Sequence, residues 1–296
     1  MHTLTGRNGL FALALFAIVL FCATHPIHVG AAQPQIGAGS CVGEHACEGL
    51  TGTVGNNSCN GDFACVNNSG DIGDNSCNRG SCTNNGGTIG NNSCSALGGN
   101  CPNNEGVIGN NSCNVIENCT DNRGEIRNDT CNSTFACQRN VGELGDRSCA
   151  GFLFACADNE GAIGRLSCGG GRSCADNRGT IGNDSCQSSG QTSSACVDNR
   201  GRIGDHSCRG LGTCNGNSGK IGIDSCNRLD PDLLDNATCS INSGSVGNNS
   251  CNDLRACYSN SGHIGNRSCN AELACSDNAG TIGNNQCNAF QECIGT

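Results

Sequence analysis

Residues 57–77 read NSCNGDFACVNNSGDIGDNSC, and the last three letters repeat the first three. In this stretch Cys65 follows Cys59 by six residues, and Cys77 follows Cys65 by twelve. The phrase recurs as far as the C-terminal residues, so the sequence is a tandem repeat with a period near 18 residues. A fixed short period is typical of a solenoid, in which each repeat forms one coil.

The cysteines from Cys41 onward fall into fourteen pairs. Each pair begins twelve residues after the pair before it ends, whereas the separation inside a pair ranges from five to thirteen. All insertions are therefore confined to one place in the repeat, as expected for loops on one edge of a solenoid. The pairs are Cys41 with Cys47, Cys59 with Cys65, Cys77 with Cys82, Cys94 with Cys101, Cys113 with Cys119, Cys131 with Cys137, Cys149 with Cys156, Cys168 with Cys174, Cys186 with Cys196, Cys208 with Cys214, Cys226 with Cys239, Cys251 with Cys257, Cys269 with Cys275 and Cys287 with Cys293.

This spacing predicts a disulfide within each pair. Cysteines a few residues apart around a corner can reach the roughly 5.5–6 Å Cα separation that disulfides prefer. Such a bond would also explain the long inserts, because it closes the loop whatever its length. Disulfides between successive coils are the alternative, and peptide mapping distinguishes the two. A zinc site is not expected, since the repeat contains no Cys-x2-Cys pair.

Between the pairs the repeat follows Cys-x-x-Asn-x-Gly-x-Ile-Gly-x-x-Ser-Cys, with an aliphatic residue at the seventh position after the first cysteine. One aliphatic residue in every 18 cannot build an amphipathic helix, and the two glycines also oppose helix. We therefore expect an all-β, disulfide-stapled parallel β-solenoid of about fourteen coils, right-handed by the usual crossover preference. Residues 33–296 would form this single domain, with Ile72 stacked over Ile89 in its interior.

The glycines and the asparagine of the repeat have further expected roles. Gly70 and Gly73 would lie at corners, where the backbone takes positive φ or passes close to a neighbouring coil. Asn68 would lie over Asn85, either as part of a hydrogen-bonded amide stack or only as a turn former that tolerates left-handed geometry. The sequence does not choose between these two roles.

The N-terminus predicts secretion. Residues 10–23 (LFALALFAIVLFCA) form an apolar run behind Arg7, and residues 29–32 (VGAA) offer a cleavage site, so residues 1–32 are expected to be a signal peptide. The alternative is a retained anchor, but a bilayer span needs ~20 residues. Removal leaves 29 − 1 = 28 cysteines and a net charge of 15 − 26 = −11. We expect a secreted, extracellular or cell-surface protein without a membrane span, which does not bind nucleic acid.

Alternation along a strand would point the ninth and eleventh positions outward, as a flat Asn-x-Ser face. Many of these pairs are acceptor sequences for N-glycosylation. The alternative is that a chain rich in Asn and Ser produces such sequences as a by-product. The candidate glycosylation sites are Asn56, Asn67, Asn91, Asn110, Asn118, Asn128, Asn132, Asn183, Asn236, Asn248 and Asn266.

Two resemblances bear on function. The phrase resembles cysteine-rich repeats (DNSCNG…ACxNN.G.IG) in secreted and surface proteins of microalgae and related protists, over residues 36–296, which implies an extracellular β-solenoid without an assigned activity. The chain is similar only in plan to the disulfide-braced insect antifreeze solenoids. Ice binding needs a regular array, whereas Asp146, Arg165, Asp205 and Ile223 interrupt the ninth position.

No catalytic residue and no cofactor are predicted. His45, His206 and His263 lie far apart, and no Ser-His-Asp order recurs around them. Asp230, Asp232 and Asp235 could form a calcium loop or simply a solvated acidic loop, and loops 187–195 and 227–238 are where a site is most expected. The prediction is a structural or adhesive extracellular protein that stacks end to end on itself or binds matrix glycans. The alternative is a surface protein that binds ice, glycan or mineral.

Overall fold

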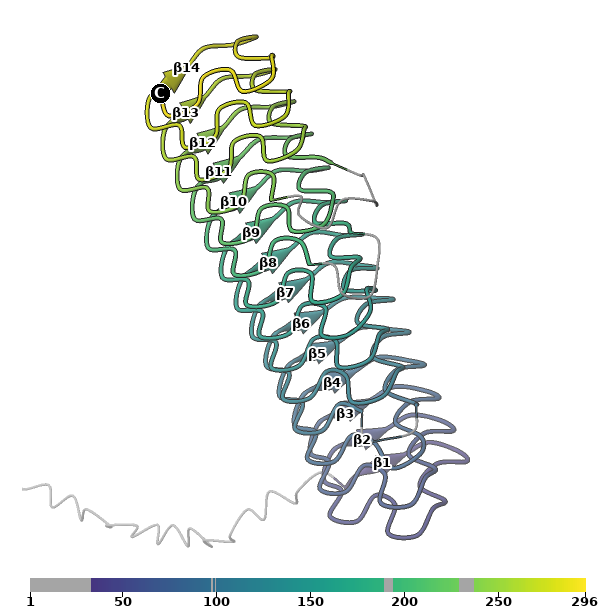
Figure 1. Ribbon diagram of the computed structural model, residues 1–296. Coiled ribbons are helices and arrows are strands. Elements are labelled where there is room, and N and C mark those ends of the chain that lie inside the picture. The colour runs from purple at the N-terminus through teal and green to yellow at the C-terminus, as the bar shows by residue number, and fades with distance from the viewer. Residues whose placement is uncertain (1–32, 97, 99, 189–193, 229–236) are drawn as a thin grey trace, which may run out of the picture. The chain divides into compact units, whose positions relative to one another are not determined.

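The computed structural model describes residues 33–96, 98, 100–188, 194–228 and 237–296. The fold that follows is that of the unit Pro34–Thr296. Its coils are stacked along one axis, with a single parallel sheet running the length of the stack (Figure 1). None of the described residues belongs to a helix long and apolar enough to cross a membrane.

The sheet contains fourteen strands in the described part, each only two residues long, in the order of the sequence. Every strand pairs in parallel with the next one, so that equivalent residues of successive coils face each other. The strands are β1 Gln35–Ile36, β2 Thr53–Val54, β3 Asp71–Ile72, β4 Thr88–Ile89, β5 Val107–Ile108, β6 Glu125–Ile126, β7 Glu143–Leu144, β8 Ala162–Ile163, β9 Thr180–Ile181, β10 Arg202–Ile203, β11 Lys220–Ile221, β12 Ser245–Val246, β13 His263–Ile264 and β14 Thr281–Ile282.

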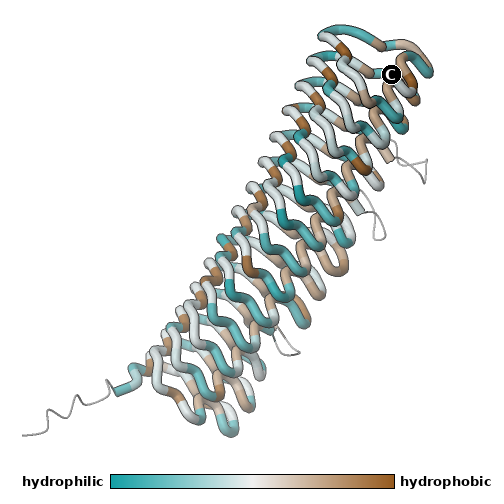
Figure 2. The backbone as a smooth tube through the Cα atoms, turned by 90° about the vertical axis from the view of Figure 1, so that its left-hand side faces the viewer, coloured by the Kyte–Doolittle hydropathy of each residue, from teal (hydrophilic) through white to brown (hydrophobic). Residues whose placement is uncertain are grey.

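An aliphatic ladder forms the interior of the sheet. The second residue of each strand from β2 to β14 is buried, and Ile72 pairs with Ile89 as expected. The first residue of each strand points away from the interior and varies in character, from Asp71 to Lys220. Figure 2 shows a hydrophobic segment recurring in coil after coil along the stack. The predicted solenoid is confirmed, and its right-handed winding stays a prediction.

The chain turns at residues with left-handed backbone geometry. In one coil these are Asn57, Cys59, Phe63, Cys65 and Asn67, with φ between 52° and 58°. Both cysteines of all fourteen pairs share this geometry. A non-glycine residue in this region costs roughly 1–2 kcal/mol, so each coil contains several locally unfavourable corners. Closure by a disulfide and stacking between coils must offset that cost.

Of the two roles expected of the repeat glycines, close approach to a neighbouring coil is confirmed, and positive φ is wrong. Gly70 and Gly73 are not among the residues with positive φ. A Cβ atom built on Gly70 would lie 1.9 Å from the carbonyl oxygen of Gly87 in the next coil, which is far inside van der Waals contact. Glycine is therefore required because two backbones meet face to face at this position in coil after coil.

A buried amide stack runs beside the aliphatic ladder. Asn85 Nδ2 donates to Asn68 Oδ1 at 2.7 Å and to the carbonyl of Gly87 at 3.2 Å. The same pair of bonds recurs as far as Asn278, whose Nδ2 donates to Asn260 Oδ1 at 2.8 Å. The amide-stack role of this asparagine is thus confirmed, and the left-handed turn belongs to the residue before it.

Every cysteine pair predicted from the spacing forms a disulfide within its own coil, and the alternative of disulfides between coils is excluded for the described residues. The Cα atoms of each bonded pair lie 5.6–6.0 Å apart, as disulfides prefer. The fourteen bonds join Cys41 and Cys47, Cys59 and Cys65, Cys77 and Cys82, Cys94 and Cys101, Cys113 and Cys119, Cys131 and Cys137, Cys149 and Cys156, Cys168 and Cys174, Cys186 and Cys196, Cys208 and Cys214, Cys226 and Cys239, Cys251 and Cys257, Cys269 and Cys275, and Cys287 and Cys293.

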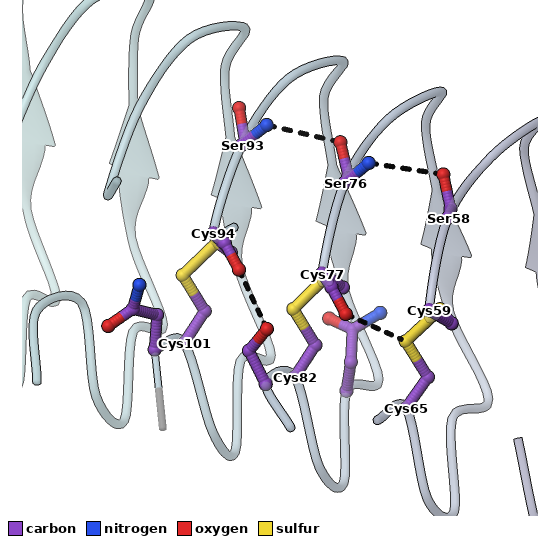
Figure 3. The surroundings of a disulfide bond; sticks show 12 residues. Ser58, Cys59, Cys65, Ser76, Cys77, Cys82, Ser93, Cys94 and Cys101 are labelled. Atoms are coloured by element: carbon purple, nitrogen blue, oxygen red, sulfur yellow. Dashed lines mark hydrogen bonds between the residues drawn. A yellow bond between two sulfur atoms is a disulfide. The ribbon is translucent and has the colours of Figure 1, made fainter. Parts of the chain in front are cut away.

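The disulfides lie in the interior of the stack. Figure 3 shows three of them in neighbouring coils. The cysteines from Cys59 to Cys275 are fully buried. The sulfur atoms of Cys94, Cys101 and Cys113 lie within 4.8 Å of one another, so disulfides of successive coils lie close together in this part of the stack.

Candidate functional site

The expected outward Asn-x-Ser face is wrong, because its serine is buried. Ser58 and Ser76 are fully buried, and the backbone N–H of Ser76 donates to Ser58 Oγ at 3.1 Å (Figure 3). Ser58 Oγ in turn donates to the carbonyl of Gly73 at 2.7 Å. The left-handed residue Asn57 stands between the ninth and eleventh positions and breaks the strand alternation on which the prediction depended. This surface therefore presents a column of asparagines without the serines.

That column has a structural reason to be asparagine or aspartate. The backbone N–H of Ala38 donates to Asn56 Oδ1 at 2.9 Å, and the N–H of Asn56 donates to Asp74 Oδ1 at 2.6 Å. The pattern recurs along the stack, and Arg165 and Ile223 interrupt it because neither side chain offers an equivalent acceptor. Much of the richness in Asn therefore satisfies backbone donors between coils.

The candidate glycosylation sites fall into different environments. Asn118 is fully buried, and its Nδ2 donates to the carbonyl of Cys131 at 2.6 Å. Asn67 Nδ2 donates to Asn84 Oδ1, Asn132 is partly buried with Nδ2 bonded to the carbonyl of Asn111, and Asn236 lies outside the described residues. The exposed members of the column keep Oδ1 bonded and leave Nδ2 without a partner among the described residues: Asn56, Asn91, Asn110, Asn128, Asn183, Asn248 and Asn266.

The three histidines are not brought together. His45 bonds Glu48 and stacks on Phe63, with ring centroids 5.1 Å apart. His206 lies between two aspartates of neighbouring coils, and His263 contacts Ser245. Asp230, Asp232 and Asp235 lie outside the described residues, as do the central parts of the two long loops.

Charged side chains form pairs along the coils. Arg123 pairs with Glu105, and Arg139 pairs with Asp158. The hydrogen bond that Arg139 donates to the Asp158 carboxylate raises the pKa of the Arg139 guanidinium above its usual value, so Arg139 stays charged. These pairs are exposed and contribute at most about 1 kcal/mol each. Their spacing along the rod does not gather acid and base groups into one place.

The most distinctive surface lies on the inserts of three successive coils, at residues 113–119, 131–137 and 149–156. We call its apolar side chains the loop-edge cluster, which comprises Ile116, Phe135, Phe152, Leu153 and Phe154. Phe135 and Phe154 stack with ring centroids 5.0 Å apart and planes 11° apart. Phe152 and Leu153 are 48% and 47% exposed, and exposed apolar side chains that lie together, rather than singly, are typical of interaction surfaces.

A groove of about 450 Å³ lies beside this cluster. Its lining combines apolar, hydroxyl and amide groups and includes no charged side chain. Sequence reasoning directed attention to the longest inserts and missed this site, although the run Phe152-Leu153-Phe154 in a chain with 3% aromatic residues was a usable signal. The groove-lining residues are Val115, Asn132, Ser133, Thr134, Ala150, Gly151, Phe152 and Leu153.

The fold and its disulfides define the class of protein as a disulfide-rich parallel β-solenoid. So many disulfides indicate an oxidising compartment. The family model described as "Domain of unknown function (DUF7640)" matches residues 27–115, 79–193, 145–246 and 189–296, and the chain belongs to this family. The overlap of the matches follows from the repeat, since a stretch of several coils fits in more than one register. No curated protein and no solved structure matches the chain.

Proposed function

We propose that the chain is a secreted, non-enzymatic structural or adhesive protein of an extracellular wall, matrix or cell surface. The observation that carries this proposal is the internal construction of the coils. Each is closed by its own disulfide and tied to the next by backbone, serine and asparagine bonds. Such a rod resists unfolding and keeps its edge loops at fixed positions, which suits a load-bearing or displaying role outside the cell.

The proposal includes two modes of assembly. The rod stacks end to end on itself, because the coil-to-coil bonds of a solenoid can continue between molecules. The inserts provide adhesion to matrix glycans, since they are where the repeat varies. An ice-binding role loses support, because the buried serines remove the flat Asn-x-Ser array.

Immunogold electron microscopy of the source cells tests the location, and thiol labelling of the native protein tests its redox state. Label in the wall, matrix or medium, with the paired cysteines fully oxidised, is the expected result. Label confined to the cytosol, or free thiols in the native protein, would overturn the proposal. Electron microscopy of concentrated protein tests assembly, and strictly monomeric short rods would contradict end-to-end stacking.

A further inference from the structure

The groove beside the loop-edge cluster is shaped by differences between three neighbouring inserts. Val115 forms one wall, and Phe152 and Leu153 form the other, while Ser133 and Thr134 lie between them on the middle coil. The cysteines that flank the insert of the second wall are seven residues apart, one more than the six of the two coils before it. At about 450 Å³ the groove falls within the roughly 300–1,000 Å³ typical of small-molecule sites.

The groove is held in shape before any ligand arrives. The backbone N–H of Phe154 donates to the carbonyl of Thr134, and that of Phe135 donates to the carbonyl of Ile116, both at 3.3 Å. The stacked rings of Phe135 and Phe154 brace the same two coils, and a disulfide closes each insert. Binding would therefore require little additional ordering of the protein, which favours affinity.

The polar groups that line the groove differ in whether they already make hydrogen bonds within the protein. Both amide atoms of Asn132 are bonded, Oδ1 to the N–H of Asn114 at 3.0 Å and Nδ2 to the carbonyl of Asn111 at 2.8 Å. Ser133 Oγ makes a long bond of 3.4 Å to the carbonyl of Cys149. The partly exposed Thr134 hydroxyl has no partner among the described residues. One hydroxyl between two apolar walls is thus available to a ligand as both donor and acceptor.

We infer that this groove binds a sugar ring of a neutral polysaccharide, an inference that rests on the proposed adhesive function. A pyranose has an apolar C–H face, which fits against Phe152, and hydroxyl groups at its rim, which fit the Thr134 hydroxyl. A purely apolar ligand would cover that hydroxyl without bonding it. An anionic polymer would find no cation in the groove and would meet a chain with a net charge of −11 after removal of residues 1–32.

A glycan attached to the chain itself is the competing occupant. Asn132, Ser133 and Thr134 form an acceptor sequence for N-glycosylation and also line the groove. A sugar on Asn132 would use the nitrogen that bonds Asn111 and would fill the space next to Thr134. Glycopeptide mapping of the native protein therefore belongs to the test, and full occupancy at Asn132 would overturn the inference.

Affinity electrophoresis of the full, oxidised secreted chain provides the binding measurement. The gels contain laminarin, mannan or hydroxyethyl cellulose as neutral probes, and alginate as the anionic probe. The variants are Phe152→Ala and Thr134→Val, with Phe63→Ala as the control, since Phe63 is an exposed aromatic residue of an insert outside the groove. A disulfide count by mass spectrometry confirms that each variant retains the folded, fully oxidised coils.

We expect retardation by at least one neutral probe, and a loss of about tenfold in affinity for Phe152→Ala, as for the removal of an aromatic anchor. Thr134→Val should reduce affinity severalfold, and Phe63→Ala should leave it unchanged. Equal binding by wild type and Phe152→Ala, binding to alginate alone, or no binding to any neutral probe would each overturn the inference. The proposed function would fail separately, through intracellular label or free thiols.

Discussion

Replacement of one buried asparagine by leucine should loosen the stack measurably. Asn122 is fully buried, and its Nδ2 donates to Asn104 Oδ1 at 2.8 Å while its Oδ1 accepts from Asn140 Nδ2 at 2.9 Å. In Asn122→Leu, Asn104 Oδ1 loses its donor, whereas Asn140 Nδ2 keeps its bond to the carbonyl of Gly142 at 3.1 Å. An orphaned buried acceptor costs about 1–3 kcal/mol.

The matched control is Asn68→Leu, at the start of the same stack. The preceding coil carries Leu50 at this position, so no amide oxygen is orphaned on that side. Both variants lose a bond to a glycine carbonyl of their own coil, at 3.0 Å for Asn68 and 3.2 Å for Asn122. The difference between the two variants therefore isolates the single orphaned oxygen of Asn104, and Leu50 shows that leucine is accommodated at this position of the repeat.

Hydrogen exchange measured by mass spectrometry on the oxidised proteins reports the local opening free energy of each coil. For each variant, the acceleration of exchange is measured relative to the same coil of the wild type. We expect this acceleration to be about 5- to 150-fold larger for Asn122→Leu than for Asn68→Leu. Equal acceleration at the two sites would refute the reasoning, because the buried stack would then contribute nothing beyond the volume it fills.

Three other predictions follow from the contacts between coils. Gly124→Ala should destabilise its coil by more than about 2 kcal/mol, because a Cβ atom would lie 2.1 Å from the carbonyl oxygen of Gly142. Gly86→Ala is the control and should be tolerated, because the nearest atom to its Cβ would be 3.6 Å away. Equal thermal stability of the two variants would contradict this prediction. Mild reduction followed by alkylation and peptide mapping should label the partly exposed Cys41–Cys47 pair before the fully buried pairs. Early labelling of a fully buried pair would contradict this, because it would show that the stack opens first in its interior. Glycopeptide mapping should find the buried Asn118 unmodified, and a fully modified Asn118 would contradict the packing. Neighbouring sites in the asparagine column, only ~4.8 Å apart, should rarely carry glycans at the same time.

The periodic features of the fold were predictable because their physical cause repeats. A cysteine pair and an aliphatic residue at constant spacing are sufficient to predict the disulfide and the interior ladder. The choice between amide stack and turn former for Asn68 needed coordinates, because Asn67, Asn68 and their equivalents are all compatible with either role in the sequence.

The corners and the serine position could not be predicted in the same way. Cysteine has no intrinsic preference for left-handed geometry, so its positive φ depends on closure of the whole coil. Once Asn57 adopts that geometry, Ser58 turns inward, and strict alternation fails over a single residue. The groove was equally hidden, since Val115, Thr134 and Phe152 come together only when three successive inserts are stacked.

The constancy of the disulfide geometry separates the spacing of the rod from the content of its inserts. The Cα atoms of Cys77 and Cys82 are 5.6 Å apart across five residues, and those of Cys226 and Cys239 are 5.8 Å apart across thirteen. An insert can therefore be lengthened or rewritten without a change in the position of the next coil. The solenoid therefore acts as a scaffold with a fixed spacing between exchangeable inserts. Peptides grafted between paired cysteines would be presented along the stack at intervals of one strand spacing.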